Sequence, residues 1–234
     1  MPRLSMTDHS LLATLQRGDW FATLPAPLQQ RILDAGEQID LTEGERLFAK
    51  GDAPDGLYCV LQGTVRISTV NEAGREMIVA LLEPPHWFGE IALFDNEPRT
   101  HDAWATADTC LLRLAQRKLE NMLELHPQDW LYFGRLLTRK LRAVFSAMED
   151  MALTPPTARL ARRLVNMADG FGTLAEGSQR TITVSQEALG SMLSLSRQTI
   201  NQSLKELEVA GAIRRMRGAI VIVEIDRLIA RGSE

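Results

Sequence analysis

The stretch WFGEIALFDNEPRT, residues 87–100, brings a glycine, a carboxylate, an arginine and a hydroxyl into one short segment, which we call the cassette. It predicts a brief strand that runs through Gly89 into one helical turn, followed by a turn that returns Arg99 and Thr100 to the same place. The first turn of a helix has free N–H groups that can donate to an anion, and a guanidinium supplies the positive charge that pairs with it. The cassette therefore predicts a phosphate-binding site.

The composition is that of a soluble globular protein of one or two domains, with 234 residues, 45% of them apolar and 24% charged. No apolar run reaches the roughly 18 residues of a membrane span, and the N-terminus lacks a signal segment. We therefore expect a cytoplasmic protein with no membrane partner. Cys59 and Cys110 are the only cysteines. Two separated thiols exclude a disulfide framework and a four-thiolate metal site, so we expect two core residues and no bound metal.

The charge is unevenly distributed along the chain, although the formal net charge is only -4. Residues 155–234 hold eleven Lys or Arg and eight Asp or Glu, whereas residues 1–154 hold 15 and 22. The modestly basic C-terminal third is thus the part that would contact nucleic acid.

Glycines and short apolar runs alternate between Ile39 and Leu114, as in LYCVL, TVRIS, MIVALL and CLLRL. Strands and turns at this spacing predict an antiparallel β-roll, with NEAGRE (71–76) as a hairpin loop. PAPLQQRILDAG predicts a helix before the roll that starts near Pro27 and ends at Gly36.

The apolar period becomes helical in HPQDWLYFGRLLTRKLRAVFSAMEDMAL, residues 126–153. Its narrow apolar seam predicts a two-stranded parallel homodimer, and a helix packed on its own domain is the alternative. TPP (154–156) ends the helix and marks a hinge. The predicted dimer residues are Trp130, Leu137, Leu141, Val144, Met148 and Met151.

Two helices separated by a short turn follow in SQEALGSMLSLSRQTINQSLKELE, residues 185–208. Ser185 and Ser196 are placed to cap them, and the second helix keeps Ile200, Leu204 and Leu207 inside. A basic hairpin with Arg217 near its tip comes next. A three-helix packing unit with a solvated polar face is the alternative, but the exposed Arg, Gln and Asn side chains are groups that bind base edges and phosphates.

The order of these parts resembles the cyclic-AMP receptor protein and fumarate-nitrate regulator (Crp/Fnr) family of bacterial transcription factors. FGE followed by PRT, the long helix and SRQT carry the resemblance over nearly the whole chain. It implies an α+β fold with a β-roll that binds an effector (1–126), a dimerisation helix and hinge (127–154) and a winged helix-turn-helix (155–234). It also implies a palindromic DNA site and contact with RNA polymerase, for which DGFGTLAEGSQR (169–180) is a candidate surface.

The resemblance also assigns roles to individual residues. Gly89 and Glu90 match the glycine and ribose-binding glutamate of the family, while Arg99 and Thr100 match the residues that hold the cyclic phosphate. The expected cofactor is thus a cyclic nucleotide, cAMP or cGMP. The predicted effector-binding residues are Gly89, Glu90, Ile91, Ala92, Arg99 and Thr100. The predicted DNA-binding residues are Ser185, Gln186, Ser196, Arg197, Gln198, Thr199, Asn201, Gln202, Lys205 and Arg217.

Several positions depart from the family pattern. Val144 and Phe145 replace the polar Thr-Ser pair that contacts adenine in the cAMP-responsive members, and His101 follows Thr100 where a small residue is usual. Gln198 replaces a glutamate, which favours an adenine contact in the operator. Ser194 replaces the glycine of the turn between the two helices.

Three alternatives to a nucleotide-gated regulator remain open. The first is a regulator of the same fold whose pocket needs no effector. The second is haem or redox sensing, with His86, His101 or Cys59 as axial ligands, although two separated thiols cannot hold an iron–sulfur cluster. The third is a cyclic-phosphodiester enzyme built on Glu90, Arg99 and His101, but neither a metal-ligand spacing nor a nucleophile motif accompanies them, so we expect no catalytic residues.

Overall fold

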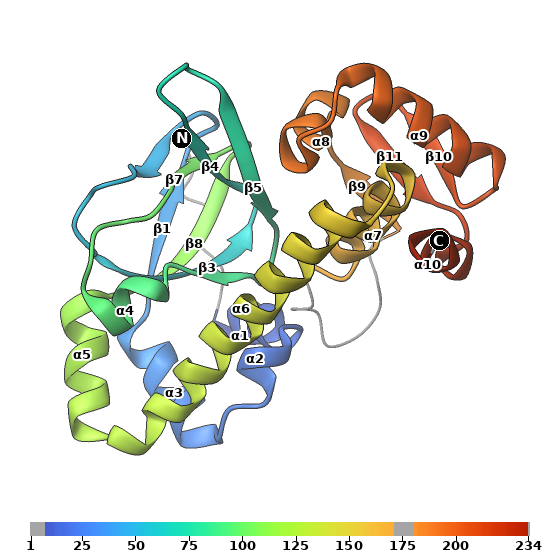
Figure 1. The fold of residues 1–234 in the computed structure, drawn as a ribbon. Helices are drawn as coiled ribbons and strands as arrows, with labels where there is room; N and C mark the ends of the chain where they lie inside the picture. Colours follow the sequence, from blue (N-terminus) through green and yellow to red (C-terminus); the bar gives the residue numbers. More distant parts are fainter. Residues whose placement is uncertain (1–7, 171–179, 234) are drawn as a thin grey trace. The chain divides into compact units, whose positions relative to one another are not determined.

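Glycine turns separate the strands of two four-stranded sheets in the computed structural model, which describes residues 8–170 and 180–233 (Figure 1). The first sheet has the order β1-β8-β3-β6 and the second β2-β7-β4-β5. The strands are β1 (Glu37–Leu41), β2 (Arg46–Phe48), β3 (Gly56–Gln62), β4 (Val65–Val70), β5 (Glu76–Leu82), β6 (Trp87–Phe88), β7 (Asp102–Ala105) and β8 (Thr109–Ala115). This architecture confirms the predicted antiparallel roll.

Strand β3 is buried on both faces because its side chains alternate between two cores. Tyr58 and Val60 point into the roll, where they pack with residues of the second sheet such as Phe48 and Val65. Leu57 and Cys59 point the other way, into a core that the helices cover. The unbroken apolar run Leu57–Leu61 of β3 thus holds the roll and its helical cover together.

Helices cover the outer face of the first sheet, and their apolar residues complete the second core. Trp20 and Phe21 pack on Trp87, the residue that begins the cassette, and Phe133 packs on Trp20. These elements are α1 (Asp8–Gln16), α2 (Asp19–Ala22), α3 (Ala26–Ala35), α5 (Gln116–Leu125), the 3₁₀ turn η1 (Pro127–Asp129) and the start of α6 (Trp130–Leu153). Gly36 follows the end of α3, as predicted.

The C-terminal part is a winged helix-turn-helix. Its three-stranded antiparallel sheet has the order β10-β11-β9, and α10 packs against α7. The elements are α7 (Pro156–Ala168), β9 (Thr181–Thr183), α8 (Gln186–Leu193), α9 (Arg197–Val209), β10 (Ile213–Met216), β11 (Ala219–Ile222) and α10 (Ile225–Gly232). The helix pair and the wing are as the sequence predicts, whereas β9 and α10 were not predicted.

The described residues divide into two compact units. The first comprises residues 8–69 and 79–141, and the second residues 70–78, 142–170 and 180–233. None of the helices in these ranges is long and apolar enough to span a bilayer.

Candidate functional site

The cassette consists of a two-residue strand, a glycine turn and a short helix. Gly89 follows β6 with a φ of +92°, and α4 (Ile91–Asp95) begins two residues later. Asn96 ends α4 in the left-handed conformation and reverses the chain. This reversal brings Arg99 back to Gly89, whose carbonyl accepts a 3.1 Å hydrogen bond from Nη1 of the guanidinium.

Glycine is required at position 89 for two reasons. Its positive φ is one that side chains with a Cβ rarely adopt. In addition, a Cβ there would lie 2.8 Å from Arg99 Nη1 and 3.2 Å from the carbonyl oxygen of Gly56. The absence of a side chain therefore lets the guanidinium lie against the backbone of the turn.

Arg99 is only 5% exposed and is paired within the chain. Its Nη2 lies 2.5 Å from Asp55 Oδ1 and donates to the carbonyl of Gly56 at 2.7 Å. The guanidinium lies over the ring of Phe48, 4.4 Å from its centroid. The Nε–H is buried and has no hydrogen-bond partner among the described residues. Because buried donors are nearly always satisfied, an N–H without a partner marks Arg99 as a candidate donor to a bound anion.

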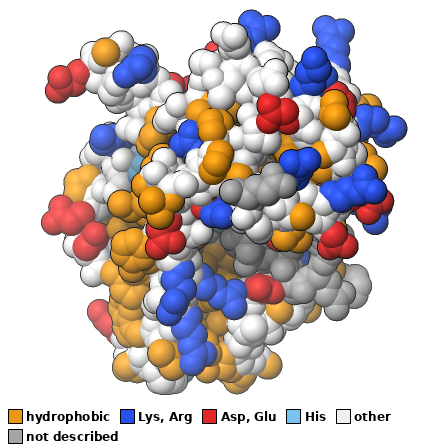
Figure 2. All heavy atoms as spheres, turned by 45° about the vertical axis from the view of Figure 1, so that its right-hand side comes forward, with side chains coloured by type: hydrophobic (Ala, Val, Ile, Leu, Met, Phe, Trp, Pro, Cys, Tyr) orange, Lys and Arg blue, Asp and Glu red, His pale blue; other side chains and the backbone are white. Residues whose placement is uncertain are grey.

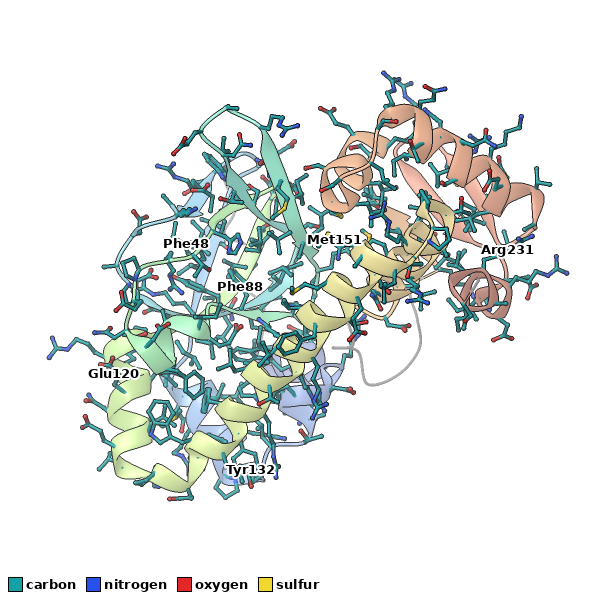
Figure 3. All side chains as sticks on the ribbon, viewed as in Figure 1. Phe48, Phe88, Glu120, Tyr132, Met151 and Arg231 are labelled. Atoms are coloured by element: carbon teal, nitrogen blue, oxygen red, sulfur yellow. The ribbon has the colours of Figure 1, made fainter. Side chains whose placement is uncertain are left out.

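Aromatic rings line the interior of the roll next to this guanidinium. Phe48 and Phe88 come from different sheets, and both point into the roll (Figure 3). Their ring centroids lie 6.3 Å apart. Tyr58 stacks on Phe88 at 5.4 Å and donates its hydroxyl to Asp55. Burial and the hydrogen bond to Asp55 both raise the pKa of Tyr58, which keeps the phenol protonated as a donor. Asp55 is thus an internal counter-ion for Arg99 that Tyr58 holds in place.

Glu90 is also paired within the chain, by a lysine on the long helix. Its side chain is 4% exposed, and Lys140 Nζ lies 2.6 Å from Oε2. The same ammonium donates to the carbonyl of Trp87 at 2.6 Å. Lys140 therefore pairs with one oxygen of the Glu90 carboxylate, the group that the resemblance assigns to ribose binding.

The remaining predicted effector-binding residues of the cassette differ in burial. Ala92 is buried, whereas Ile91 and Thr100 are exposed. Thr100 Oγ1 lies 2.9 Å from His101 Nδ1. Partial burial, and then the charge of Lys50, lower the pKa of His101, so the imidazole is neutral at physiological pH.

The first turns of α6 pack on the roll through residues outside the predicted seam, and the later seam residues are exposed. Phe133 and Leu136 are buried on the first three turns, and Trp130 contacts Phe94 of α4 at 5.4 Å. Leu137 is half-buried. The later seam residues Leu141, Val144, Met148 and Met151 are each about half exposed, as is Phe145. A Cβ on Gly134 would meet no atom of the described residues within 4 Å, so their packing does not explain this helical glycine.

Exposed apolar side chains form a contiguous band on the surface of the protein (Figure 2). Figure 2 shows a band of apolar side chains on the surface at the lower left, beside basic ones. Contiguous exposed apolar surface is typical of an interaction site.

The helix-turn-helix has the caps that the sequence predicts. Ser185 Oγ accepts from the N–H of Ala188 at 3.0 Å, and Ser196 Oγ accepts from that of Thr199 at 3.1 Å. Ser194 ends α8 with a φ of +53°, in the left-handed region that usually favours glycine. The predicted inward residues Ile200, Leu204 and Leu207 are all buried.

The predicted DNA-binding residues lie on the solvent side of this motif. The exposed ones are Ser185, Ser196, Arg197, Gln198, Gln202, Lys205 and Arg217, and the half-buried ones are Gln186, Thr199 and Asn201. Figure 2 shows Lys and Arg side chains gathered at the upper right of the surface, with fewer acidic ones between them. An exposed basic face of this kind suits a phosphate backbone.

The wing is tied to α9 by a residue that the sequence analysis did not single out. Glu208 accepts from the backbone N–H of Arg215 at 2.9 Å and from its Nε at 2.7 Å. These hydrogen bonds, the backbone one first, lower the pKa of Glu208. Arg217 and Gly218 form the tip, between β10 and β11. The loop 169–180, a candidate polymerase surface, lies largely outside the described residues.

Asp55 and Lys140 are the other site residues that the sequence analysis did not identify. They are 44 and 50 positions away from their partners Arg99 and Glu90, so no local pattern connects them. Within residues 8–170 and 180–233, no group of three or more His, Cys, Asp or Glu could hold a metal ion.

Comparisons with known proteins agree with this division of the chain. Residues 38–126 match the model of the cyclic nucleotide-binding domain, and residues 158–231 that of the Crp-like helix-turn-helix domain. The chain is 29% identical over 196 residues to a CRP-like cAMP-activated global transcriptional regulator of Mycobacterium tuberculosis, covering 83% of this chain and 88% of the relative. It is 27% identical over 178 residues to the cAMP-activated global transcriptional regulator CRP of Haemophilus influenzae, covering 75% and 79%. The solved structure of FixK2 from Bradyrhizobium japonicum superimposes with a TM-score of 0.72 at 20% identity, covering 82% of this chain and 95% of that one.

Proposed function

The chain belongs to the Crp/Fnr family of DNA-binding transcription regulators, and from this premise we propose that it is a homodimer whose β-roll binds a cyclic nucleotide. It is a regulator and not an enzyme. In this proposal residues 1–126 bind the effector, residues 127–154 join two copies and residues 155–234 bind a palindromic promoter site. Contact with RNA polymerase is part of the same proposal.

The buried guanidinium of Arg99 is the observation that carries the effector proposal. It lies against the carbonyl of Gly89, and its Nε–H has no partner among the described residues. Glu90 follows Gly89 in the chain, and its Oε2 pairs with Lys140. A cyclic phosphate would accept from the guanidinium and from the hydroxyl of Thr100, and a ribose 2′-hydroxyl would donate to Glu90.

The effector class is tested by isothermal titration calorimetry with cAMP, cGMP and, as a control, the open-chain 5′-AMP. The two relatives are named as cAMP-activated, but Val144 and Phe145 offer no hydrogen bonds from their side chains to a base. We therefore expect binding of a cyclic nucleotide with weak discrimination between adenine and guanine. Absence of heat for both cyclic nucleotides, with protein that is folded and free of copurified ligand, would refute the effector proposal.

Replacing Asp55 by asparagine is expected to tighten nucleotide binding about tenfold, because the phosphate then no longer shares Arg99 with a carboxylate. The measurement is the Kd in the same titration. Asp52→Asn is the matched control, since Asp52 lies in the same loop but its side chain accepts from the N–H of Ala49 and not from Arg99. Equal or weaker affinity in Asp55→Asn would show that the counter-ion does not compete with the ligand.

A regulator without a nucleotide effector is the second candidate function. It is favoured by the internal pairing, because Arg99 and Glu90 already have charge partners of their own in the chain. Gel shifts with and without nucleotide on the same promoter DNA separate the two candidates. DNA binding that is equally tight in both would favour the second.

Arg197→Ala is expected to weaken binding to the preferred DNA site by about 1–3 kcal/mol while leaving nucleotide affinity unchanged, since Arg197 is exposed at the start of α9. Fluorescence anisotropy at fixed salt measures the first quantity and calorimetry the second. Arg231→Ala, on the exposed side of α10, is the control for loss of one positive charge. If the two variants weakened binding equally, Arg197 would contribute only its charge.

A further inference from the structure

A chain of side-chain hydrogen bonds links the exposed face of α9 to the first turn of α7. Glu206 lies at its centre, with both carboxylate oxygens occupied. Oε1 accepts from Gln202 Nε2 at 2.9 Å, and Oε2 accepts from the hydroxyl of Thr157 at 2.7 Å. Gln202 is on the exposed face of α9, one helical turn before Glu206.

The chain of hydrogen bonds has a fixed direction. Thr157 Oγ1 also lies 2.9 Å from Ser203 Oγ, and Ser203 is 2% exposed. A carboxylate only accepts and a hydroxyl has one proton, so Thr157 donates to Glu206 and accepts from Ser203. The hydrogen bonds from Thr157 and then Gln202 lower the pKa of Glu206, which keeps the carboxylate ionised at physiological pH. Linked hydrogen bonds of this kind strengthen one another.

The ionised carboxylate also fixes which way the Gln202 amide points. Only the NH₂ end can face an acceptor, so Oε1 of Gln202 must face away from Glu206. One N–H is then committed to Glu206. The Gln202 amide therefore has one N–H and the neighbouring carbonyl oxygen left to bind a DNA base.

We propose that Glu206, anchored by Thr157, orients Gln202 so that it recognises adenine and discriminates against guanine. In the major groove adenine offers one acceptor, N7, and one donor, the N6 amino group, whereas guanine offers two acceptors, N7 and O6. One free N–H and one carbonyl match adenine and leave guanine O6 facing an acceptor. This inference rests on the proposed function, in which α9 lies in the major groove of the promoter site.

A Gln–Glu pair four residues apart on an exposed helix is by itself a common and weak interaction. Here the hydroxyl of a residue on another helix holds the carboxylate, so the amide is oriented by tertiary structure. Thr157 and Glu206 are thus positioning residues. A purely structural role for them would change stability, but it would not change which base is preferred.

The test uses the full chain and a duplex selected from a randomised DNA library. The Kd is measured at fixed salt for the selected duplex and for variants with each base pair replaced in turn. We expect Gln202→Ala to lose a roughly tenfold or greater preference for adenine over guanine at one position of each half-site. Glu206→Ala and Thr157→Val should reduce the preference at that same position several-fold and leave the other positions unchanged.

Two control variants separate orientation from charge and from folding. Glu208→Ala removes a carboxylate of the same helix that pairs with the wing, so it should leave this base preference intact. Thr157→Ser keeps the hydroxyl and should restore the wild-type preference. Thermal unfolding identifies any variant that is not folded at the assay temperature.

The outcomes distinguish this inference from the proposed function. If Gln202→Ala lost the preference while Glu206→Ala and Thr157→Val kept it, the orienting role would be refuted and DNA recognition by α9 would stand. If Gln202→Ala changed no base preference while Arg197→Ala did, the inference would likewise be overturned. If neither Gln202→Ala nor Arg197→Ala altered DNA binding, the proposed function itself would fail.

Discussion

Replacement of Arg99 by alanine is expected to reduce nucleotide affinity by at least about 100-fold and also to destabilise the roll by about 2–3 kcal/mol. The first effect follows from loss of the charge partner of the phosphate. The second follows from burial: the substitution removes the guanidinium that donates to the carbonyls of Gly56 and Gly89 and pairs with the Asp55 carboxylate, which keeps only its hydrogen bond from Tyr58. Water reaches Asp55, whose side chain is 41% exposed, and this keeps the cost at the low end for a buried ion pair.

Calorimetry for binding and denaturant unfolding for stability measure the two effects separately. The double variant Asp55→Asn/Arg99→Ala should recover part of the lost stability and none of the binding. Retention of nucleotide binding in folded Arg99→Ala would refute the assignment of the cassette.

Replacement of Leu141 by aspartate is expected to convert the proposed dimer to monomers at micromolar concentration. Leu141 is half exposed in the single chain and belongs to the seam that would face a second copy. A dimer would then bury two carboxylates opposite one another, at a cost of several kcal/mol. Since a monomer binds one half-site, affinity for a palindromic site should fall by about 100-fold or more.

Sedimentation equilibrium gives the oligomeric state, and anisotropy gives the DNA affinity. Ser146→Asp introduces the same charge on an exposed position of α6 off the seam, and it should remain dimeric. A Leu141→Asp protein that still sedimented as a dimer would place the contact between copies elsewhere.

Local patterns in the sequence predict much of the fold and part of the candidate site. The caps Ser185 and Ser196, the left-handed Gly89 and the inward residues of α9 depend on interactions within a few positions, and short patterns record such interactions. The two-sided burial of β3 follows in the same way from its unbroken apolar run.

The electrostatic partners inside the site could not be predicted in this way. Asp55, Lys140 and Thr157 contact residues 44 to 50 positions away, and only the tertiary fold brings them there. An aspartate in a turn, a lysine on an amphipathic helix and a threonine after a Pro-Pro pair are each ordinary in sequence. Their significance comes from the charged group that each of them contacts in the fold.

The two cysteines provide an intrinsic chemical probe of how often the roll opens. Cys59 of β3 and Cys110 of β8 are fully buried free thiols, and burial raises the pKa of both, that of Cys110 to about 12. The thiolate is the form that attacks an alkylating reagent, so in the native state neither sulfur should react, and the labelling rate measures transient unfolding. Because the helix-turn-helix contains no cysteine, the labelling reports on the roll alone, and a ligand of the roll should slow it in proportion to its occupancy.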